Sequence, residues 1–311
     1  MFYNIKNKAK YARFNFQTRK ILDTIPLKSS EFPIYSVHTM VCERDVQLYL
    51  LSIKSFISRV KGGKVFVHSD GSLSQRSSEK LKRHLPGIRI VTPEEAEGKA
   101  KRELNTSLQN IRKYGGTFDR LIDSVLWAQG THHIQMDCDI LTVKDPEYII
   151  DWVTSGSHPF VISDYKKEKM GIPESGFENA HIQTQMEHRQ QEISEKTGFD
   201  FGDTIGLCSG LYGWTDQIQM ADIETFVQAC KEMGFDMTRW GAEQVTTTWL
   251  LSAMQAQRLP GKEYINLQPP AFHLVDTASM IHFIGDHRFK NNWYAQKAVK
   301  EINRLIERSG V

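Results

Sequence analysis

The chain has 311 residues, of which 40% are apolar and 24% are charged, a composition that supports a large hydrophobic core and excludes a disordered protein. Its 39 basic and 37 acidic residues leave a formal net charge of +2, which argues against nucleic acid as a partner. The four cysteines form no C-x-x-C pair, which argues against a zinc knuckle and favours a reduced, cytoplasmic protein. We expect neither a signal peptide nor a transmembrane segment.

We expect a basic N-terminal arm over residues 1–30, followed by a single domain over residues 31–311. The first twenty residues contain six lysines and arginines and no acid, interleaved with five aromatic side chains. Such a segment suits either a solvated arm folded onto the domain or contact with an anionic membrane surface. In the second case the protein would lie peripherally at the inner face of a membrane.

Strands and helices alternate over the first half of the chain. Residues 32–41 are predicted to form a strand, and residues 44–60 place apolar side chains at helical spacing. The elements predicted next are strand 62–72, helix 77–85, strand 87–95, helix 117–130 and strand 132–143. This order predicts an α/β fold with a mainly parallel central sheet and helices on both faces, whose ligands bind beyond the carboxyl ends of the strands.

The pattern weakens in the second half. Residues 164–204 are polar with little apolar face, so they are predicted to form a mobile lid, an acceptor-facing insertion or a plain exposed excursion. The elements predicted after it are a strand broken by glycines at 205–214, helices at 222–233 and 241–255, strand-like material at 270–285 and a basic helix at 295–311.

An Asp-x-Asp pair interrupts the apolar stretch "HIQMDCDILTV". Aspartate is disfavoured inside strands, and an unpaired buried carboxylate is costly, so Asp137 and Asp139 require solvent or a cation. Side chains at i and i+2 share one side of a strand, about 7 Å apart, close enough to converge on one divalent ion. Oxygen ligands favour Mg²⁺ or Mn²⁺, and we predict such a site at this strand end.

Four further stretches strengthen this interpretation by resemblance. "TFDRL" resembles a T-x-x-R-L helix, "CSGLYGW" resembles a segment N-S-G-V, "AEQ" resembles a D-Q dipeptide and "HFIGDHRF" resembles H-F-x-G-x-x-K-P-W. Together with the Asp-x-Asp pair, over roughly residues 34–290, they resemble metal-dependent glycosyltransferases of the GT-A fold. The closest resemblance is to the retaining family that includes glycogenin and the bacterial lipopolysaccharide galactosyltransferases. The sequence departs from that family at Cys208, Glu243, Arg288 and Phe289, where the family has Asn, Asp, Lys and Pro.

The resemblance implies a nucleotide-sugar donor, expected to be a UDP-sugar, bound on Mn²⁺ or Mg²⁺. Asp139 would be the main metal ligand, Asp137 would contact the donor ribose and the metal, and His282 would complete the coordination. Arg120 and Arg288 would clamp phosphate or sugar oxygens. The metal would act as a Lewis acid on the diphosphate leaving group.

The remaining site residues are assigned by their motif or by their position in the chain. Gly206, Ser209, Gly210 and Gly285 would lie against the donor. Glu243 would orient the sugar or act as a base, and Gln244 would hydrogen-bond near the anomeric carbon. At the tips of the first two strands, Thr39 and Met40 are candidates for the nucleobase and ribose and Asp70 for the base edge; each of the three could instead form a turn.

Two alternatives to a glycosyltransferase remain. A nucleotidyltransferase would normally have a glycine-rich basic loop after its first strand, which "SVHTMVCERD" lacks. A non-catalytic saccharide-binding or scaffolding protein could retain the fold after losing the chemistry, and the departures at Cys208, Glu243 and Phe289 leave that alternative open. For the transferase, we expect the acceptor to be a cell-surface or glycolipid saccharide.

Overall fold

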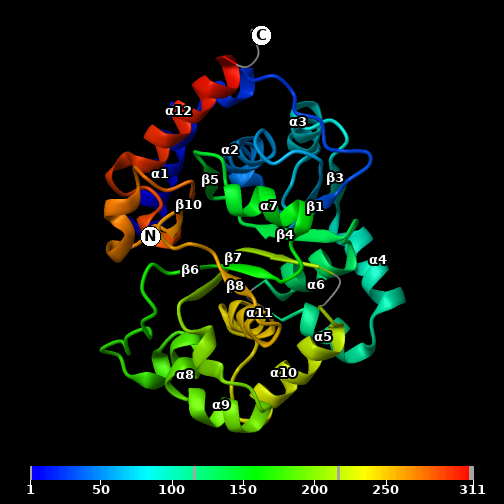
Figure 1. Cartoon of the computed structure of the whole chain (residues 1–311), viewed down its shortest axis with the longest axis vertical. Coiled ribbons are helices and arrows are strands. Elements are labelled where there is room, and N and C mark those ends of the chain that lie inside the picture. The colour runs from blue at the N-terminus through cyan, green and yellow to red at the C-terminus, as the bar shows by residue number, and fades with distance from the viewer. Residues whose placement is uncertain (1, 115–116, 216–217, 308–311) are drawn as a thin grey trace.

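The computed structural model describes residues 2–114, 117–215 and 218–307 (Figure 1). The helices are α1 Phe2–Gln17, α2 Val46–Ile57, α3 Gln75–His84, α4 Pro93–Glu103, α5 Thr106–Arg112, α6 Phe118–Leu126, α7 Glu147–Ser155, α8 Ile182–His188, α9 Gln190–Thr197, α10 Met220–Glu232, α11 Ala242–Ala253 and α12 Trp293–Glu307. The strands are β1 Tyr35–Val41, β2 Gly63–Ser69, β3 Arg89–Val91, β4 His132–Met136, β5 Ile140–Thr142, β6 Phe160–Ser163, β7 Leu207–Trp214, β8 Gln257–Arg258, β9 Tyr264–Asn266 and β10 Met280–His282.

Two sheets are present in the described part of the chain. The larger has seven strands in the order β3-β2-β1-β4-β7-β6-β8, and β3, β2, β1 and β4 pair in parallel. Strand β7 runs antiparallel to both of its neighbours, β4 and β6. The smaller sheet has the order β5-β10-β9. The predicted α/β fold with a mainly parallel central sheet is confirmed.

Helices cover both faces of the larger sheet, as Figure 1 shows with α2 and α12 on one side and α8 to α11 on the other. Strand β6 explains why two cores form, because its side chains alternate between the faces. Phe160 and Ile162 are buried in the core beside α2 and α12, whereas Val161 is buried in the core beside α10 and α11. A strand buried on both faces reads as a continuous apolar run, which is what these residues show.

The first and last helices pack together at the edge of the molecule (Figure 1). Phe14 of α1 is buried and lies 4.5 Å, between ring centroids, from Tyr294 of α12. Tyr294 in turn stacks on Phe283, just after β10, at 4.0 Å. Phe14 of the basic N-terminal segment and Tyr294 of α12 therefore join both ends of the chain to the strand that carries His282.

The structure corrects one predicted strand and refines another. Residues 132–143 do not form one strand, because a turn at residues 137–139 separates β4 from β5 and moves the chain into the second sheet. Strand β7 runs from Leu207 to Trp214, but its pairing with β6 shifts register between Cys208 and Tyr212, so the ladder is irregular beside Gly210. Gly210 and Gly213 are needed there because a side chain at either position would overlap a ring, that of His282 or Phe160.

Of the strand-like material predicted at 270–285, only β10 is a strand; the segment starts in a 3-10 helix, Pro269–Leu274, and continues through turns. The predicted C-terminal helix is α12, whose last expected residues, 308–311, lie outside the described part of the chain. Of the helices that the structure describes, none combines the length and the apolar character that crossing a membrane requires.

Candidate active site

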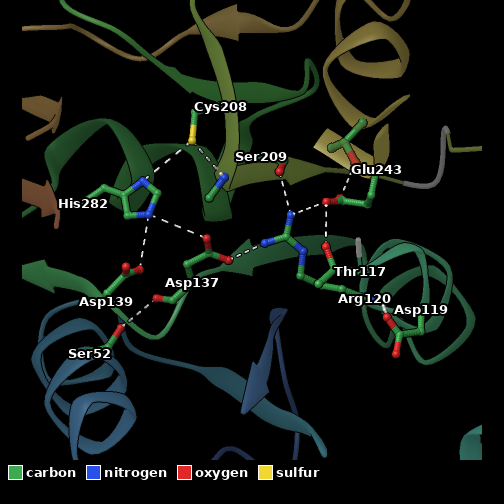
Figure 2. Close-up of polar contacts among 12 residues, drawn as sticks. Ser52, Thr117, Asp119, Arg120, Asp137, Asp139, Cys208, Ser209, Glu243 and His282 are labelled. Carbon is green, nitrogen blue, oxygen red and sulfur yellow. Dashed lines mark hydrogen bonds and ion pairs between the residues drawn. The ribbon is translucent and has the colours of Figure 1, made fainter. Parts of the chain in front are cut away.

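A cavity of about 700 Å³ opens where the β4–β5 turn, α6, β7, β10 and the start of α11 meet. Several predicted site residues line it, and Figure 2 shows most of them pointing toward one another. They are Arg120, Asp137, Asp139, Gly206, Ser209, Gly210, Glu243, Gln244, His282, Gly285 and Arg288. The fold thus brings together residues from distant parts of the sequence.

The two aspartates lie in the turn between β4 and β5. Backbone bonds hold this turn, because the N–H of Asp137 donates to the carbonyl of Gly210 at 2.8 Å and that of Ile140 donates to the carbonyl of Asp137 at 3.3 Å. Ser52 of α2 also donates to the carbonyl of Asp137. The turn, and not the side-chain alternation of a strand, therefore directs both carboxylates into the cavity.

His282 faces both carboxylates with the same ring nitrogen. Its Nε2 lies 3.6 Å from Oδ2 of Asp137 and 3.3 Å from Oδ1 of Asp139 (Figure 2). At metal–ligand bonds of about 2.1 Å, neighbouring ligands of an octahedral ion are about 3 Å apart, so these three atoms fit one cation. One ligand atom from each side chain lies within 4.8 Å of the others.

The other nitrogen of His282 has a partner that determines its tautomer. Nδ1 lies 3.0 Å from Oδ1 of Asn266, which can only accept a hydrogen bond, so Nδ1 carries the proton. The amide orientation of Asn266 follows from its second bond, in which Nδ2 donates to Asp164 at 2.8 Å. Nε2 is therefore the ring atom that faces the two aspartates, and in the neutral ring its lone pair is the one that binds metals.

Asp164 and Asn266 were missed by sequence reasoning. Asp164 directly follows β6 and Asn266 ends β9, so their positions at strand ends were the only available signal. Burial raises the pKa of Asp164, while Asn266 and Gln268 lower it by hydrogen bonding. The hydrogen bonds from Asp164 through Asn266 to Nδ1 of His282 therefore fix the orientation of the imidazole on the side away from the aspartates.

The pKa values of Asp137, Asp139 and His282 depend on burial and on the charges beside them. Burial alone would raise the pKa of Asp139, but the charges of Arg288 and His282 outweigh it and hold this pKa well below its usual value. Burial opposes the charged form of His282, yet Asp139 raises the pKa of that imidazole well above its ordinary value. Burial raises the pKa of Asp137 despite the opposing charges of Arg120 and His282. A proton on Nε2 thus occupies the position that a metal ion would take.

Arg120 of α6 connects the turn to the opposite side of the cavity. Its guanidinium donates to Asp137 at 2.5 Å, to the hydroxyl of Ser209 at 2.6 Å and to Glu243 at 2.6 Å (Figure 2). Glu243, which is 1% exposed, also accepts hydrogen bonds from Thr247 and Thr117. The predicted proximity of Arg120 and Glu243 to the aspartates is therefore present in the structure.

Arg288 lies on the other side of Asp139. One guanidinium nitrogen donates to Asp139 and another donates to the hydroxyl of Tyr11, which belongs to α1. The Nε–H of Arg288 donates to the carbonyl of Phe283 at 3.1 Å. The N-terminal helix thus helps to hold a cation beside the aspartate turn, a contribution that sequence reasoning missed because 277 positions separate the two residues.

Cys208 departs from the family pattern but occupies a defined place. Its sulfur lies 3.7 Å from Nδ1 of His282 and accepts a hydrogen bond from the N–H of Gly210. Position 210 requires glycine because the imidazole of His282 lies close to the backbone there, and a Cβ would be 2.3 Å from its Cε1. Both residues therefore support the imidazole from β7.

Three predicted donor-binding residues are not among the described residues that line the cavity. Thr39 is buried in β1, and neither it nor the neighbouring Met40 lines the cavity. Asp70 accepts hydrogen bonds from the backbone and hydroxyl of Ser72, which makes it a turn former. The alternative that such residues serve local structure fits Asp70.

The polar segment 164–204 folds over one end of the cavity. Gln183 and Glu187 of α8 line it, and Gln183 accepts a hydrogen bond from Gln244 at 2.8 Å. Glu187 accepts hydrogen bonds from the N–H of Met170 at 2.8 Å and from Gln183 at 2.9 Å. Sequence reasoning singled out this segment but not these residues, because α8 has no motif.

Comparisons with known proteins show similarity in structure and none in sequence. The sequence matches no protein-family model and no curated protein. The solved galactosyltransferase LgtC in complex with donor and acceptor sugar analogues is similar over 87% of this chain and 96% of its own, with 11% identity and a TM-score of 0.52. An active-site mutant of LgtC is similar over 86% of this chain and 95% of its own, with 10% identity and a TM-score of 0.52.

The bifunctional glycosyltransferase WbbM is similar over 90% of this chain and 52% of its own, with 11% identity and a TM-score of 0.50. This chain therefore spans about half of WbbM. The structural neighbours are GT-A glycosyltransferases, as the resemblance of the motifs predicted. The chain has the GT-A fold, with an Asp-Asp-His group in the lining of its cavity.

Proposed function

We propose that the protein is a glycosyltransferase that moves a sugar from a nucleoside-diphosphate donor, a UDP-sugar, to a saccharide or glycolipid acceptor. Asp137, Asp139 and His282 would hold a divalent metal, Mn²⁺ or Mg²⁺. The observation that carries the proposal is the convergence of Nε2 of His282, whose ring Asn266 orients, with two carboxylates. Two carboxylates and an imidazole nitrogen that converge on one point form a ligand set that suits a divalent cation.

The metal would supply the positive charge that a departing diphosphate needs. Arg288 lies next to Asp139 and is anchored by Tyr11, so its guanidinium is placed to bind phosphate oxygens through parallel hydrogen bonds. Because this cation is already held by the protein, little ordering is required when a donor arrives. Arg288 would thereby take the role of the lysine that stands at this position in the family that the sequence resembles.

On the opposite side of the metal ligands, Arg120 would orient the donor sugar together with Ser209. We assign Glu243 to positioning Arg120, because both of its carboxylate oxygens accept hydrogen bonds from protein groups. Gln244 follows it into the cavity and donates from its side-chain amide to Gln183, so its carbonyl oxygen is assigned to the substrate. This departs from the prediction of a base at Glu243, since a buried, ion-paired carboxylate is poorly placed to take a proton from an acceptor.

One observation favours the non-catalytic alternative. Each aspartate already has an arginine partner, Arg120 for Asp137 and Arg288 for Asp139, so the charges are balanced without a metal. A saccharide-binding protein that had lost its chemistry would bind sugars and would not require a metal for nucleotide binding.

Calorimetric titration separates the two functions. UDP, GDP and their common sugars are titrated into the wild-type protein with and without Mn²⁺, and donor turnover is then measured with the nucleotide that binds. We expect one nucleotide to bind only with the metal and its sugar conjugate to be hydrolysed slowly. If no nucleotide binds under either condition, the transferase proposal fails and the binding-protein alternative replaces it.

We further propose that α1 contacts an anionic membrane surface, where a glycolipid acceptor would be found. Lys8, Lys10 and Arg13 are exposed on this helix, and Phe16 is 67% exposed. Each basic residue near such a surface contributes about 1 kcal/mol. Co-sedimentation with phosphatidylserine vesicles should be reduced by replacing these three cations with glutamine, and equal sedimentation of the variant contradicts the proposal.

A further inference from the structure

Trp240 lines the cavity together with residues of the segment 164–204. It lies in the turn that precedes α11 and is 72% exposed. Scattered exposed apolar residues need no explanation, but this indole borders the cavity that also holds Glu243 and Gln244. Tryptophan offers a large apolar face together with one N–H donor, which suits a ligand that is partly apolar and partly hydroxylated.

The surroundings of Trp240 hold its backbone firmly. The ring of His181 meets the indole edge-on at 4.9 Å between centroids and an angle of 77°. Gly241, with φ +96°, lies directly against His181, because a Cβ there would be 2.1 Å from Cε1 of the imidazole. Arg239 is turned away from the cavity and donates to the carbonyl of Ala180 at 2.7 Å. A platform that is ordered before binding loses little entropy when a ligand arrives.

The charge at this end of the cavity indicates which ligand can use the platform. Among the described residues, segments 164–187 and 240–244 contribute Asp164, Glu168, Glu187 and Glu243 to the lining and no lysine or arginine. A phosphate or carboxylate on the ligand would meet only like charge there. Glu187 lines the cavity although it is only 2% exposed, and burial raises its pKa. It accepts hydrogen bonds from Met170 and Gln183, and a carboxylate has about four acceptor sites, so acceptor sites remain for hydroxyl groups.

We propose that Trp240 is the platform on which a neutral sugar ring of the acceptor stacks, with Glu187 accepting hydrogen bonds from its hydroxyls. The C–H face of a pyranose is apolar, so stacking removes apolar area from water on both partners. The proposal rests on the glycosyltransferase function, because it assigns this end of the cavity to the acceptor while the metal ligands and Arg288 hold the donor. It specifies the acceptor as an uncharged saccharide.

The test measures saccharide binding separately from nucleotide binding. Lactose, cellobiose, maltose and diacetylchitobiose are titrated into wild-type protein with and without UDP and Mn²⁺, and sialyllactose serves as the anionic counterpart. The same titrations use Trp240→Ala, Trp240→Phe and a control, Phe32→Ala. Phe32 is 91% exposed but does not line the cavity, so this control removes an exposed aromatic ring elsewhere.

We expect at least one neutral saccharide to bind the wild type, and Trp240→Ala to weaken it about tenfold or more. Trp240→Phe should retain most of the affinity, and Phe32→Ala all of it, with UDP binding unchanged in every variant. The proposal is overturned if no neutral saccharide binds the wild type, if sialyllactose binds best, or if Trp240→Ala binds as the wild type does. Saccharide binding that depends on Trp240 without nucleotide binding would instead reject the transferase function and retain the platform.

Discussion

Two parts of the cavity lining differ in burial and in charge. At the end with the Asp-Asp-His group, charged side chains are buried and each one is balanced by another, as Arg120 is by Asp137 and Glu243. At the other end, Trp240 is open to solvent and the lining comes from the polar segment 164–204. Charges fixed in a buried site suit a ligand that always carries the same diphosphate. An open aromatic surface on a loop suits a ligand recognised by shape, which varies between proteins of one fold.

The largest difference between the two ends should be in stability. Arg120→Met would leave the buried carboxylate of Glu243 and the half-buried carboxylate of Asp137 without their cation, and we expect a loss of about 3–5 kcal/mol in the free energy of unfolding. Lys196→Met is the control, because Lys196 and its partner Glu232 are both exposed and such pairs contribute about 0–1 kcal/mol. Urea denaturation measures both, and an equal loss in the two variants would remove the distinction.

The next effect concerns nucleotide binding. Asp139→Asn removes one charge from the proposed metal site, and we expect Mn²⁺-dependent UDP binding to weaken at least about a hundredfold, or ~2.7 kcal/mol. Asp70→Asn is the control, because Asp70 lies in its own turn outside the cavity. Calorimetry that finds weaker UDP binding in Asp70→Asn would instead support the position first predicted from the sequence, at the nucleobase.

A smaller effect on metal binding is expected at Asn266, which hydrogen-bonds to the proposed ligand His282. Asn266→Ala frees the imidazole of His282 from its hydrogen bond, and we expect Mn²⁺ affinity to fall about 10–100-fold. Asp70→Asn, which lies outside the cavity in its own turn, should leave this affinity unchanged. Mn²⁺ binding is followed by electron paramagnetic resonance, and an unchanged affinity in Asn266→Ala would show that the Asp164–Asn266–His282 chain does not hold the ligand.

Two glycine substitutions sharpen the comparison further. Gly210→Ala and Gly241→Ala each place a methyl group against a histidine ring, His282 at 2.3 Å and His181 at 2.1 Å. We expect Gly210→Ala to reduce Mn²⁺ affinity several-fold and Gly241→Ala to leave it intact while weakening saccharide binding. Gly241→Ala also has a backbone cost of about 1–2 kcal/mol, because Gly241 has a positive φ. The same loss of Mn²⁺ affinity in both variants would indicate a general loosening of the fold.

Local periodicity was sufficient for the fold class and for the two aspartates. Alternating strands and helices predicted the parallel half of the sheet, because each element's apolar spacing reflects how it packs. Asp137 and Asp139 were identified because charge inside an apolar run is costly unless it is compensated. His282 and Arg288 required the resemblance, since one histidine or arginine among many gives no local signal.

The tertiary structure decided the features that depend on distant contacts. The turn at residues 137–139 exists because the chain leaves one sheet for another, which no window of sequence around "MDCD" indicates. Asn266 matters only because folding places it beside His282, and Trp240 only because segment 164–204 completes a cavity next to it. Short-range patterns report the burial of each element, whereas the partner of a polar side chain is determined by how the whole chain closes on itself.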